Sequence, residues 1–388
     1  MKKVLIVCHD NLLYGASKSL LDWVKTVDKD KEQYEFVFLI PNTSGPLKSE
    51  LEKTGQKVVQ LRYYQPIRKF NSNTLEIRLK NIVRAMLCRI FNPIAIGKMK
   101  KLCLTERIDL IHSNSFVISI GAEIALKAGL PHVWHIREFM EEDHMMSYIY
   151  SDSYVKKLTK RSYPIYISRA IKKKFENFFP ADVGAVIYNT IGRDKNYKKN
   201  RTYMQDGICN LIIVGKITKN KGQLEAIQAV EEVIRRGYNA KLYVCGEGPD
   251  EAEIRKYINA HSLQESIKLL GFRQDVVKIR TNMDIALMCS SNEAFGRVTV
   301  EGMYYGNLII GKKSAGTEEI IKNGENGLLY EPNSSVTLAN LIVKMIENQT
   351  DAKMMIAAAK EYAINTFSKS IFPSVKEIYD SAIGEKKC

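Results

Sequence analysis

The stretch DIALMCSSNEAFGRVTVEGMYYGNLIIG, residues 284–311, predicts a strand, a loop, a helix and a second strand in that order. The runs at 285–289 and 308–311 are continuously apolar or small, as expected for strands buried on both faces of a sheet. Residues 298–305 place apolar side chains at helical spacing, and Gly306 ends the pattern. Two strands joined through a helix run parallel in one sheet. This stretch therefore predicts an α/β fold.

The same alternation occupies two separate halves of the chain. Strand patterns and amphipathic helix patterns alternate over residues 2–178, where one long helix is expected over 75–91, and again over 209–332. Each half therefore predicts a parallel sheet with helices on both faces. Residues 186–207 are polar, charged and without periodicity, which is typical of a linker. We predict one doubly wound domain over residues 1–188 and a second over 205–366.

The bulk composition fits two soluble globular domains. The chain has 388 residues, of which 45% are hydrophobic and 26% charged. No uninterrupted apolar stretch reaches the roughly 18 residues of a membrane span, and the start of the chain predicts a strand rather than a signal peptide. The seven cysteines contain no CxxC pair. They predict buried thiols in a reducing cytoplasm, with no disulfide framework and no zinc site.

The net charge of +15 favours a polyanionic partner, which could be nucleic acid, an anionic membrane or a phosphorylated ligand. The sequence contains no helix-turn-helix, no RNA-binding aromatic strand and no zinc-finger spacing, so we expect no nucleic acid partner. Much of the charge lies in the first half. Residues 77–90 combine four cations with an apolar stripe: Arg78, Lys80, Arg84 and Arg89 beside Ile77, Ile82, Met86 and Ile90. This segment is either a solvated helix face or a peripheral contact with anionic lipid.

Ligands of open α/β sheets bind at the carboxyl ends of the strands, so candidate site residues should follow strands. Gly15 follows the first strand and could bring a phosphate to the next helix, although a plain turn is an equal alternative. Lys216 and Lys221 follow the strand at 209–214, where two ammonium groups suit a diphosphate and solvated lysines are the alternative. His135 ends a strand of the first half and could contact sugar hydroxyls or transfer a proton, although a lone His is more often structural.

Glu293 and Glu301 are separated by about 2.2 helical turns if the helical pattern is extended over both. Glu293 falls in the loop after a strand, and Glu301 falls within the helix that follows. This spacing indicates two contacts along one elongated ligand rather than an acid/base pair. A capping Glu293 and a surface Glu301 are the alternative.

Six short motifs in the second half occur in the order that is typical of a known enzyme family. The second half contains VGKITKNKG, CGEGP, LLGFRQDV, SSNEAFGRVTVEGMYYG, SAGTEEII and NGENGLLYEP in this order. Together they resemble the retaining GT-B glycosyltransferases of glycosyltransferase family four over residues 205–335, and the spacing of Glu293 and Glu301 matches the family signature. The first half resembles the family more loosely, through YGASKSLL, HSNS and HIRE. The resemblance implies two Rossmann-like domains facing a central cleft, with a C-terminal helix within 367–388 crossing back to the first domain.

The resemblance also implies roles for single residues. A nucleotide-sugar donor would have its ribose on Glu301, its sugar on Glu293 and its diphosphate on Lys216 and Lys221. His135 would lie near the donor sugar and the acceptor. The remaining donor contacts would come from the loops: Gly271, Phe272 and Arg273 at the base, and the N–H groups around Phe295, Gly296, Arg297 and Gly15 at the phosphates. No metal and no cofactor are expected.

Three positions depart from the family pattern. Lys216 stands where the family often has Arg, which keeps the charge but loses the bidentate fork. Tyr14 precedes Gly15 where a Gly–Gly pair is common, and Ala315 precedes Gly316 at the second such pair. None of these changes removes a charge that the chemistry needs.

The function that the resemblance implies is sugar transfer to a glycan or lipid-linked acceptor. Family habit and the basic charge favour bacterial surface polysaccharide synthesis, in the cytoplasm or peripherally on the inner face of the cytoplasmic membrane. A GT-B nucleotide-sugar epimerase or hydrolase is the alternative enzyme.

Overall fold

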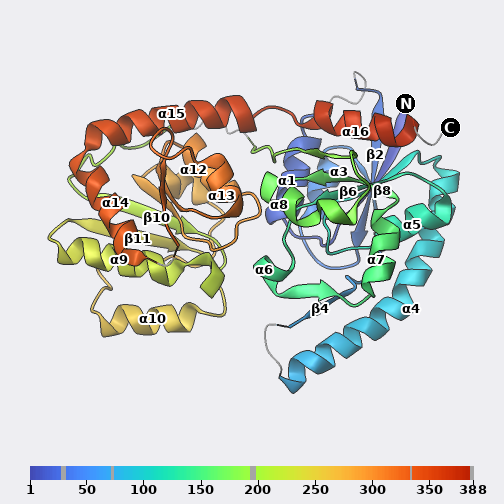
Figure 1. Cartoon of the computed structure of the whole chain (residues 1–388), viewed down its shortest axis with the longest axis horizontal. Coiled ribbons are helices and arrows are strands. Elements are labelled where there is room, and N and C mark those ends of the chain that lie inside the picture. The colour runs from blue at the N-terminus through green and yellow to red at the C-terminus, as the bar shows by residue number, and fades with distance from the viewer. Residues whose placement is uncertain (28–31, 71–73, 193–197, 333, 385–388) are drawn as a thin grey trace. The chain divides into compact units, whose positions relative to one another are not determined.

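The protein consists of two compact units, which are described separately (Figure 1). The structure is a computed structural model and describes residues 1–27, 32–70, 74–192, 198–332 and 334–384. The first unit comprises Met1–Thr190 and Ser370–Cys388, and the second comprises Ile191–Lys369. Residues 193–197 of the expected linker and Cys388 lie outside the described residues.

The first unit contains a seven-stranded parallel sheet with the order β3-β2-β1-β5-β6-β8-β9. Its strands are β1 (Lys2–Val7), β2 (Tyr34–Pro41), β3 (Lys57–Leu61), β5 (Leu110–Ser113), β6 (His132–Ile136), β8 (Ser162–Tyr166) and β9 (Ala185–Val186). Its helices are α1 (Gly15–Val24), α3 (Leu47–Lys53), α4 (Leu75–Thr105), α5 (Ile120–Ala128), α6 (Glu141–His144), α7 (Asp152–Thr159), α8 (Arg169–Phe175), the 3-10 turn η1 (Glu176–Phe178) and α16 (Phe372–Gly384). A separate antiparallel pair, β4 (Ile67–Lys69) with β7 (Met146–Tyr148), was not predicted from the sequence.

The second unit contains a six-stranded parallel sheet with the order β12-β11-β10-β13-β14-β15. Its strands are β10 (Cys209–Val214), β11 (Ala240–Cys245), β12 (Ile267–Leu269), β13 (Ile285–Met288), β14 (Leu308–Lys312) and β15 (Leu328–Tyr330). Its helices are the 3-10 turn η2 (Lys219–Lys221), α9 (Gln223–Arg235), α10 (Glu251–Ala260), α11 (Val276–Arg280), α12 (Arg297–Tyr304), α13 (Ala315–Ile320), α14 (Ser335–Glu347) and α15 (Gln349–Phe367).

Both sheets follow the doubly wound plan. Counted within each sheet, the first strand lies near the centre, the second and third lie on one side of it, and the fourth and later strands lie on the other. The point where the order reverses is the place where such sheets bind ligands. It falls between β1 and β5 in the first unit and between β10 and β13 in the second.

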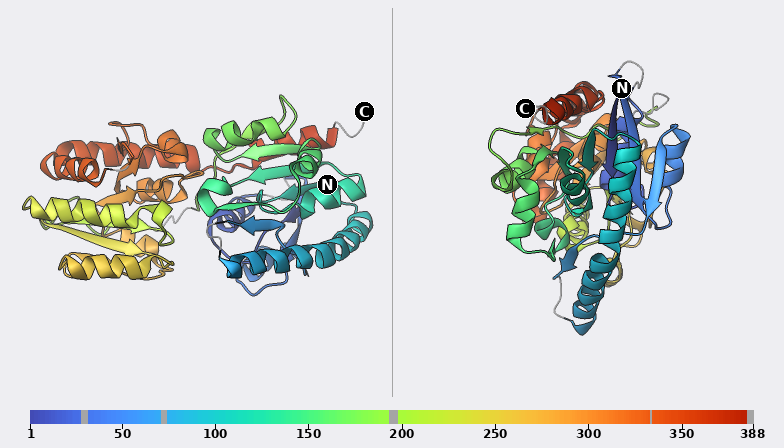
Figure 2. Two further views of the ribbon diagram at one scale, coloured as in Figure 1. Left: turned by 60° about the horizontal axis from the view of Figure 1, so that its bottom comes forward. Right: turned by 90° about the vertical axis from the view of Figure 1, so that its right-hand side faces the viewer.

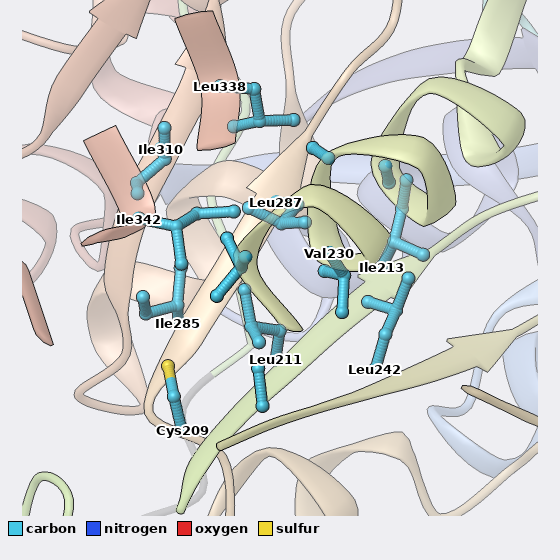
Figure 3. Close-up of a cluster of buried hydrophobic side chains, with 14 of the residues drawn as sticks. Cys209, Leu211, Ile213, Val230, Leu242, Ile285, Leu287, Ile310, Leu338 and Ile342 are labelled. Atoms are coloured by element: carbon cyan, nitrogen blue, oxygen red, sulfur yellow. The ribbon is translucent and has the colours of Figure 1, made fainter. Parts of the chain in front are cut away.

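Aliphatic side chains from strands and helices make the core of the second unit (Figure 3). Val230 of α9 and Leu338 and Ile342 of α14 belong to this core. The strands contribute the members Cys209, Leu211, Ile213, Leu242, Ile285, Leu287 and Ile310. Because burying one such side chain contributes on the order of 2 kcal/mol, this core fixes the strand ends that carry the site.

Helix α16 completes the core of the first unit, although it follows the second unit in the chain. The ring of Phe372 stacks on Trp23 at 5.9 Å between centroids. Tyr379 is fully buried, and its hydroxyl lies 2.6 Å from Nδ1 of His112. The hydroxyl of Tyr34 donates to Asp380 at 2.7 Å.

Helix α4 is longer than the sequence predicts. The expected helix over 75–91 continues through Pro93 to Thr105. Its buried side chains stabilise the helix on both sides of the proline: Cys88, Asn92, Ala95, Ile96, Met99 and Cys103. Packing against the unit thus outweighs the hydrogen bond that Pro93 cannot donate. Two views of the ribbon show this long helix along the edge of its unit (Figure 2).

Candidate functional site

The carboxyl edge of the second sheet holds most of the predicted site residues. The loops after β10 and β13 begin side by side, because these two strands are neighbours at the point where the strand order reverses. Gly222 allows the two loops to approach closely. Its backbone has a φ of +72°, and a Cβ at this position would lie 2.4 Å from the carbonyl oxygen of Cys289.

Lys221 and Glu293 meet across these two loops. The Lys221 ammonium donates a hydrogen bond to Oε2 of Glu293 at 2.8 Å, and the side chains are 31% and 19% exposed. Their partial exposure leaves both charges within reach of a ligand. The sequence assigned the two residues to adjacent parts of one donor, and the structure brings them together. Their roles toward the donor stay predictions.

A different set of groups holds Glu301, which lies in the middle of α12. Nε of Arg297 donates to Oε1 of Glu301 at 2.8 Å. The guanidinium of Arg280 lies 3.8 Å from Oε2. Arg280 is fully buried, and burial lowers its pKa. Arg280 was not predicted from the sequence, because a single Arg in a short helix is ordinarily solvated.

The loop from Glu293 to Gly296 is held by the helix α13. The backbone N–H of Gly316 donates to the carbonyl of Glu293 at 2.8 Å. A Cβ on Gly316 would lie 2.8 Å from that same oxygen and 2.8 Å from Cα of Phe295. Gly296 has a φ of +94° and directly precedes α12. The ring of Phe295 is buried beside Phe367, at 5.7 Å between centroids.

The other predicted donor contacts lie at neighbouring strand ends. Lys216 is exposed just beyond β10, and its carbonyl accepts a hydrogen bond from the side chain of Gln223 at 3.0 Å. Gly271 and Phe272 follow β12, and the exposed ring of Phe272 offers a face on which a base could stack. Arg273 forms a bidentate ion pair with the carboxylate of Asp275, at 2.7 and 2.8 Å.

In the first unit, the structure places His135 inside a strand rather than at its end. Strand β6 ends at Ile136, and the imidazole of His135 is fully buried. Burial, with the nearby charge of Arg137, lowers the pKa of His135 well below its usual value, so the ring is neutral. A direct contact with a sugar would require the surrounding side chains to move. The role of His135 stays a prediction.

Arg137 and Glu138 are the residues that follow the end of β6. Nε of Arg137 donates to Asn114 at 2.8 Å and Nη1 donates to Asn189 at 2.5 Å, while Nη2 lies 3.2 Å from Nδ1 of His135. Glu138 accepts hydrogen bonds from the hydroxyl of Ser115 and from two backbone N–H groups in the loop after β5. Applying the strand-end rule to the residues after Ile136 would have found both.

Gly15 begins α1, with a φ of +39° and open space where a Cβ would be. The preceding loop is held by Asp10, whose carboxylate accepts from the hydroxyl of Ser17 at 2.7 Å and pairs with Nε2 of His9 at 3.1 Å. Although burial lowers the pKa of His9, the hydrogen bond and charge of Asp10 raise it overall.

Within the part of the chain that the structure describes, no helix is both long and apolar enough to cross a bilayer. The same residues contain no group of three or more His, Cys, Asp or Glu side chains that could hold a metal. Six of the seven cysteines fall in the described ranges, and all six are buried free thiols.

Comparisons with known proteins indicate that the chain is similar to glycosyltransferases. Residues 194–362 match the family described as glycosyl transferases group 1. The N-acetyl-alpha-D-glucosaminyl L-malate synthase of Bacillus anthracis is 25% identical over 208 residues, 52% of this chain and 54% of that protein. The capsular polysaccharide biosynthesis glycosyltransferase CapM of Staphylococcus aureus is 26% identical over 176 residues, 45% of this chain and 46% of that protein. The aligned segment thus spans about half the length of these two curated relatives.

A solved structure resembles the whole chain. The Anabaena protein HepE, crystallised with UDP and glucose, has a TM-score of 0.75 and 22% sequence identity, covering 98% of this chain and 100% of that one. The predicted fold class is confirmed: the chain is an α/β protein with two Rossmann-like units, as in the GT-B glycosyltransferases.

Proposed function

We propose that this protein is a retaining glycosyltransferase that moves a sugar from a nucleotide-sugar donor to a glycan or lipid-linked acceptor. The observation that carries the proposal is the pair of Lys221 and Glu293, which lies where the strand order reverses in a unit that matches the group 1 family. The UDP and glucose bound to HepE support a nucleoside-diphosphate sugar as donor. The name of CapM supports a role in bacterial surface polysaccharide synthesis.

The proposed donor lies along the carboxyl edge of the second sheet. Glu301 accepts hydrogen bonds from the ribose hydroxyls, and Glu293 accepts them from the sugar hydroxyls. Lys216 and Lys221 bind the diphosphate, assisted by the loop N–H groups of residues 295–297. The exposed ring of Phe272 stacks on the base, with Gly271 and Arg273 beside it.

In the proposed reaction, the lysine cations stabilise the departing phosphate, and no side chain acts as a nucleophile. The bond between the sugar C1 and the diphosphate oxygen breaks as the acceptor oxygen bonds to C1 on the same face. The acceptor proton passes to the departing phosphate, and the Lys221 and Lys216 ammonium groups stabilise the charge that develops there. Because these side chains supply the positive charge, we propose that the reaction uses no metal and no cofactor. Glu293 forms no covalent intermediate.

The first unit is the proposed acceptor side. The helix end at Gly15 adds N–H groups for the donor phosphates. We propose that His135 acts through Arg137, whose guanidinium it contacts at the end of β6. We also propose that the enzyme works in the cytoplasm, in contact with an anionic membrane surface. Because the named relatives are a synthase and a transferase, the epimerase or hydrolase alternative is not favoured.

A thermal-shift panel of UDP-, GDP-, ADP- and dTDP-sugars tests the donor site. Ligand at 100 times its Kd should raise the melting temperature by roughly 5–10 °C, and one nucleotide should stand out. Lys221→Met should abolish the shift. Lys219→Met is the matched control, because Lys219 lies in the same turn with its side chain 81% exposed. If none of the four donors raises the melting temperature, the proposal is wrong.

A further inference from the structure

Helix α4 has apolar side chains on two opposite faces. One face packs into the first unit through the buried residues given above. The other face carries seven large apolar side chains that are 52% to 73% exposed: Leu75, Leu79, Ile82, Val83, Met86, Ile90 and Ile94. At 3.6 residues per turn these seven lie within an arc of roughly 120°, so they form one continuous strip. We call this strip the outer face of α4.

An exposed strip of this size is unusual for a monomeric protein. Single exposed apolar residues are common, but a contiguous row of them marks a surface that binds another apolar surface. Phe70, the last residue of its described segment, and Met145 are also more than 40% exposed. The backbone N–H of Phe70 donates to the carbonyl of Met145 at 3.0 Å, so these two side chains come from neighbouring segments.

The charges around the outer face are almost all of one sign. Helix α4 contains seven Lys and Arg residues and a single carboxylate, Glu76, which pairs with Lys80. On a helical projection, Arg78 and Arg89 flank one edge of the strip and Lys80 flanks the other. The exposed side chains of Lys98, Lys100 and Lys101 follow at the C-terminal part of the helix. Among the described residues, neither Arg78 nor Arg89 forms an ion pair.

We propose that the outer face of α4 lies in the headgroup region of an anionic lipid bilayer, with its apolar strip inserted and its flanking cations on lipid phosphates. An apolar strip with basic margins is the pattern of helices that lie in the plane of a membrane interface. A second copy of the chain fits less well, because a symmetric pairing of this face would bring the same cations together.

A cavity beside the strip offers a binding site for the acceptor at the membrane surface. This part of the inference rests on the proposed function. The cavity has a volume of 630 Å³, and Ile77 and Arg78 of α4 line it. Phe116 and Phe139, which follow strands β5 and β6, line it as well, together with Lys174. The lining also includes Arg68 and Lys69, so that four cations face two carboxylates, Glu141 and Asp152. Aromatic walls with this excess of positive charge suit an amphiphilic anion. A lipid-linked acceptor with a phosphate headgroup has this chemistry and could enter from the bilayer.

Co-sedimentation of the full chain with vesicles tests the docking surface without any enzyme assay. Binding to vesicles containing phosphatidylglycerol is expected at low salt, and weaker binding to pure phosphatidylcholine. The double variant Ile82→Glu/Met86→Glu should reduce binding by roughly tenfold or more. Met354→Glu is the matched control, because Met354 is 61% exposed on the second unit and should leave binding unchanged. Replacing Arg78 and Arg89 by Gln should cost roughly fivefold for each charge and flatten the salt dependence.

The variant Ile82→Trp tests insertion directly, through the fluorescence of the new tryptophan. The two native tryptophans, Trp23 and Trp134, are fully buried, so quenching by brominated lipid reports mainly the new residue. Strong quenching supports insertion. Absence of wild-type binding at low salt, full binding by the double variant, or a dimer in sedimentation velocity that the double variant dissociates would each overturn the proposal. A normal thermal shift with nucleotide sugar in the double variant separates this result from a failure of the proposed function.

Discussion

The Lys221 ammonium lies 2.8 Å from a carboxylate oxygen of Glu293, although the two residues are 72 positions apart in the chain. The contact joins the loop after β10 to the loop after β13. Each residue therefore positions the other where a charged ligand would bind. In the proposed function, a donor phosphate competes with Glu293 for Lys221 and releases the carboxylate toward the sugar.

Lys221→Met should lower the rate of sugar transfer by on the order of 100-fold, because the developing phosphate charge loses a cation. Glu293→Gln should lower transfer while leaving nucleotide affinity nearly intact. The double variant should lose less than the sum of the two, since both members of one contact are removed. Steady-state kinetics of the four proteins measures this coupling, and strictly additive losses would show that the pair does not act as a unit.

Glu301→Gln should weaken nucleotide binding by roughly tenfold or more, because a carboxylate that accepts ribose hydrogen bonds becomes a neutral amide. Arg280→Met should act in the same direction but less strongly, since Arg280 touches only the far side of that carboxylate. Titration calorimetry with the nucleotide measures both. Glu325→Gln, an exposed carboxylate of the same unit, is the control. Unchanged affinity in Glu301→Gln would contradict the ribose assignment.

Gly316→Ala should displace the loop that carries Glu293, because its Cβ would overlap backbone atoms of Glu293 and Phe295. We expect a loss of about 1–3 kcal/mol in the free energy of unfolding and a lower transfer rate. Gly97→Ala is the control. Gly97 lies in α4 with open space around it, so alanine there should be neutral or slightly stabilising. Chemical denaturation compares the two, and equal stabilities would refute the predicted overlap.

Acid should destabilise the first unit through its buried histidines. Burial lowers the pKa of His132 to about 3 and also lowers the pKa of His112 and His135. The unfolded chain takes up protons below pH 6.5 while the folded chain does not, so stability falls as pH falls from 6.5 toward about 3. Each such histidine contributes a slope of about 1.4 kcal/mol per pH unit.

The variant His132→Asn should show a shallower dependence of unfolding free energy on pH between 6.5 and 5. Denaturant melts at several pH values measure the slope. His261→Asn supplies the control, because His261 is partly exposed and pairs with Glu231 at the surface of the other unit. A slope that stays the same in His132→Asn would mean that this histidine does not contribute.

Much of the second unit could be predicted from the sequence, because its strands are continuous apolar runs and its site residues directly follow them. Glu293 and Lys216 illustrate this, since each is found by stepping beyond a strand. Helices α14 and α15 were not predicted. The buried Leu338, Ala339, Ile342 and Met345 of α14 carried a helical periodicity that would have identified it.

The features that could not be predicted from the sequence depend on contacts between segments that are distant in the chain. Arg280 reaches Glu301 only because the end of α11 lies beside α12, and no local pattern reveals this. The length of α4 was underestimated because Pro93 ordinarily ends a helix, whereas here tertiary packing extends it. His135 and Arg137 are two residues apart, and which of them lies beyond the strand depends on where β6 ends.

The position of α16 in the chain has a consequence for synthesis on the ribosome. The first unit lacks Phe372 and Tyr379 until all of the second unit has been translated. The second unit is one continuous segment and can fold as soon as it emerges, whereas the first must wait with part of its core uncovered. We therefore expect the usual order of cotranslational folding, in which the N-terminal domain matures first, to be reversed in this protein.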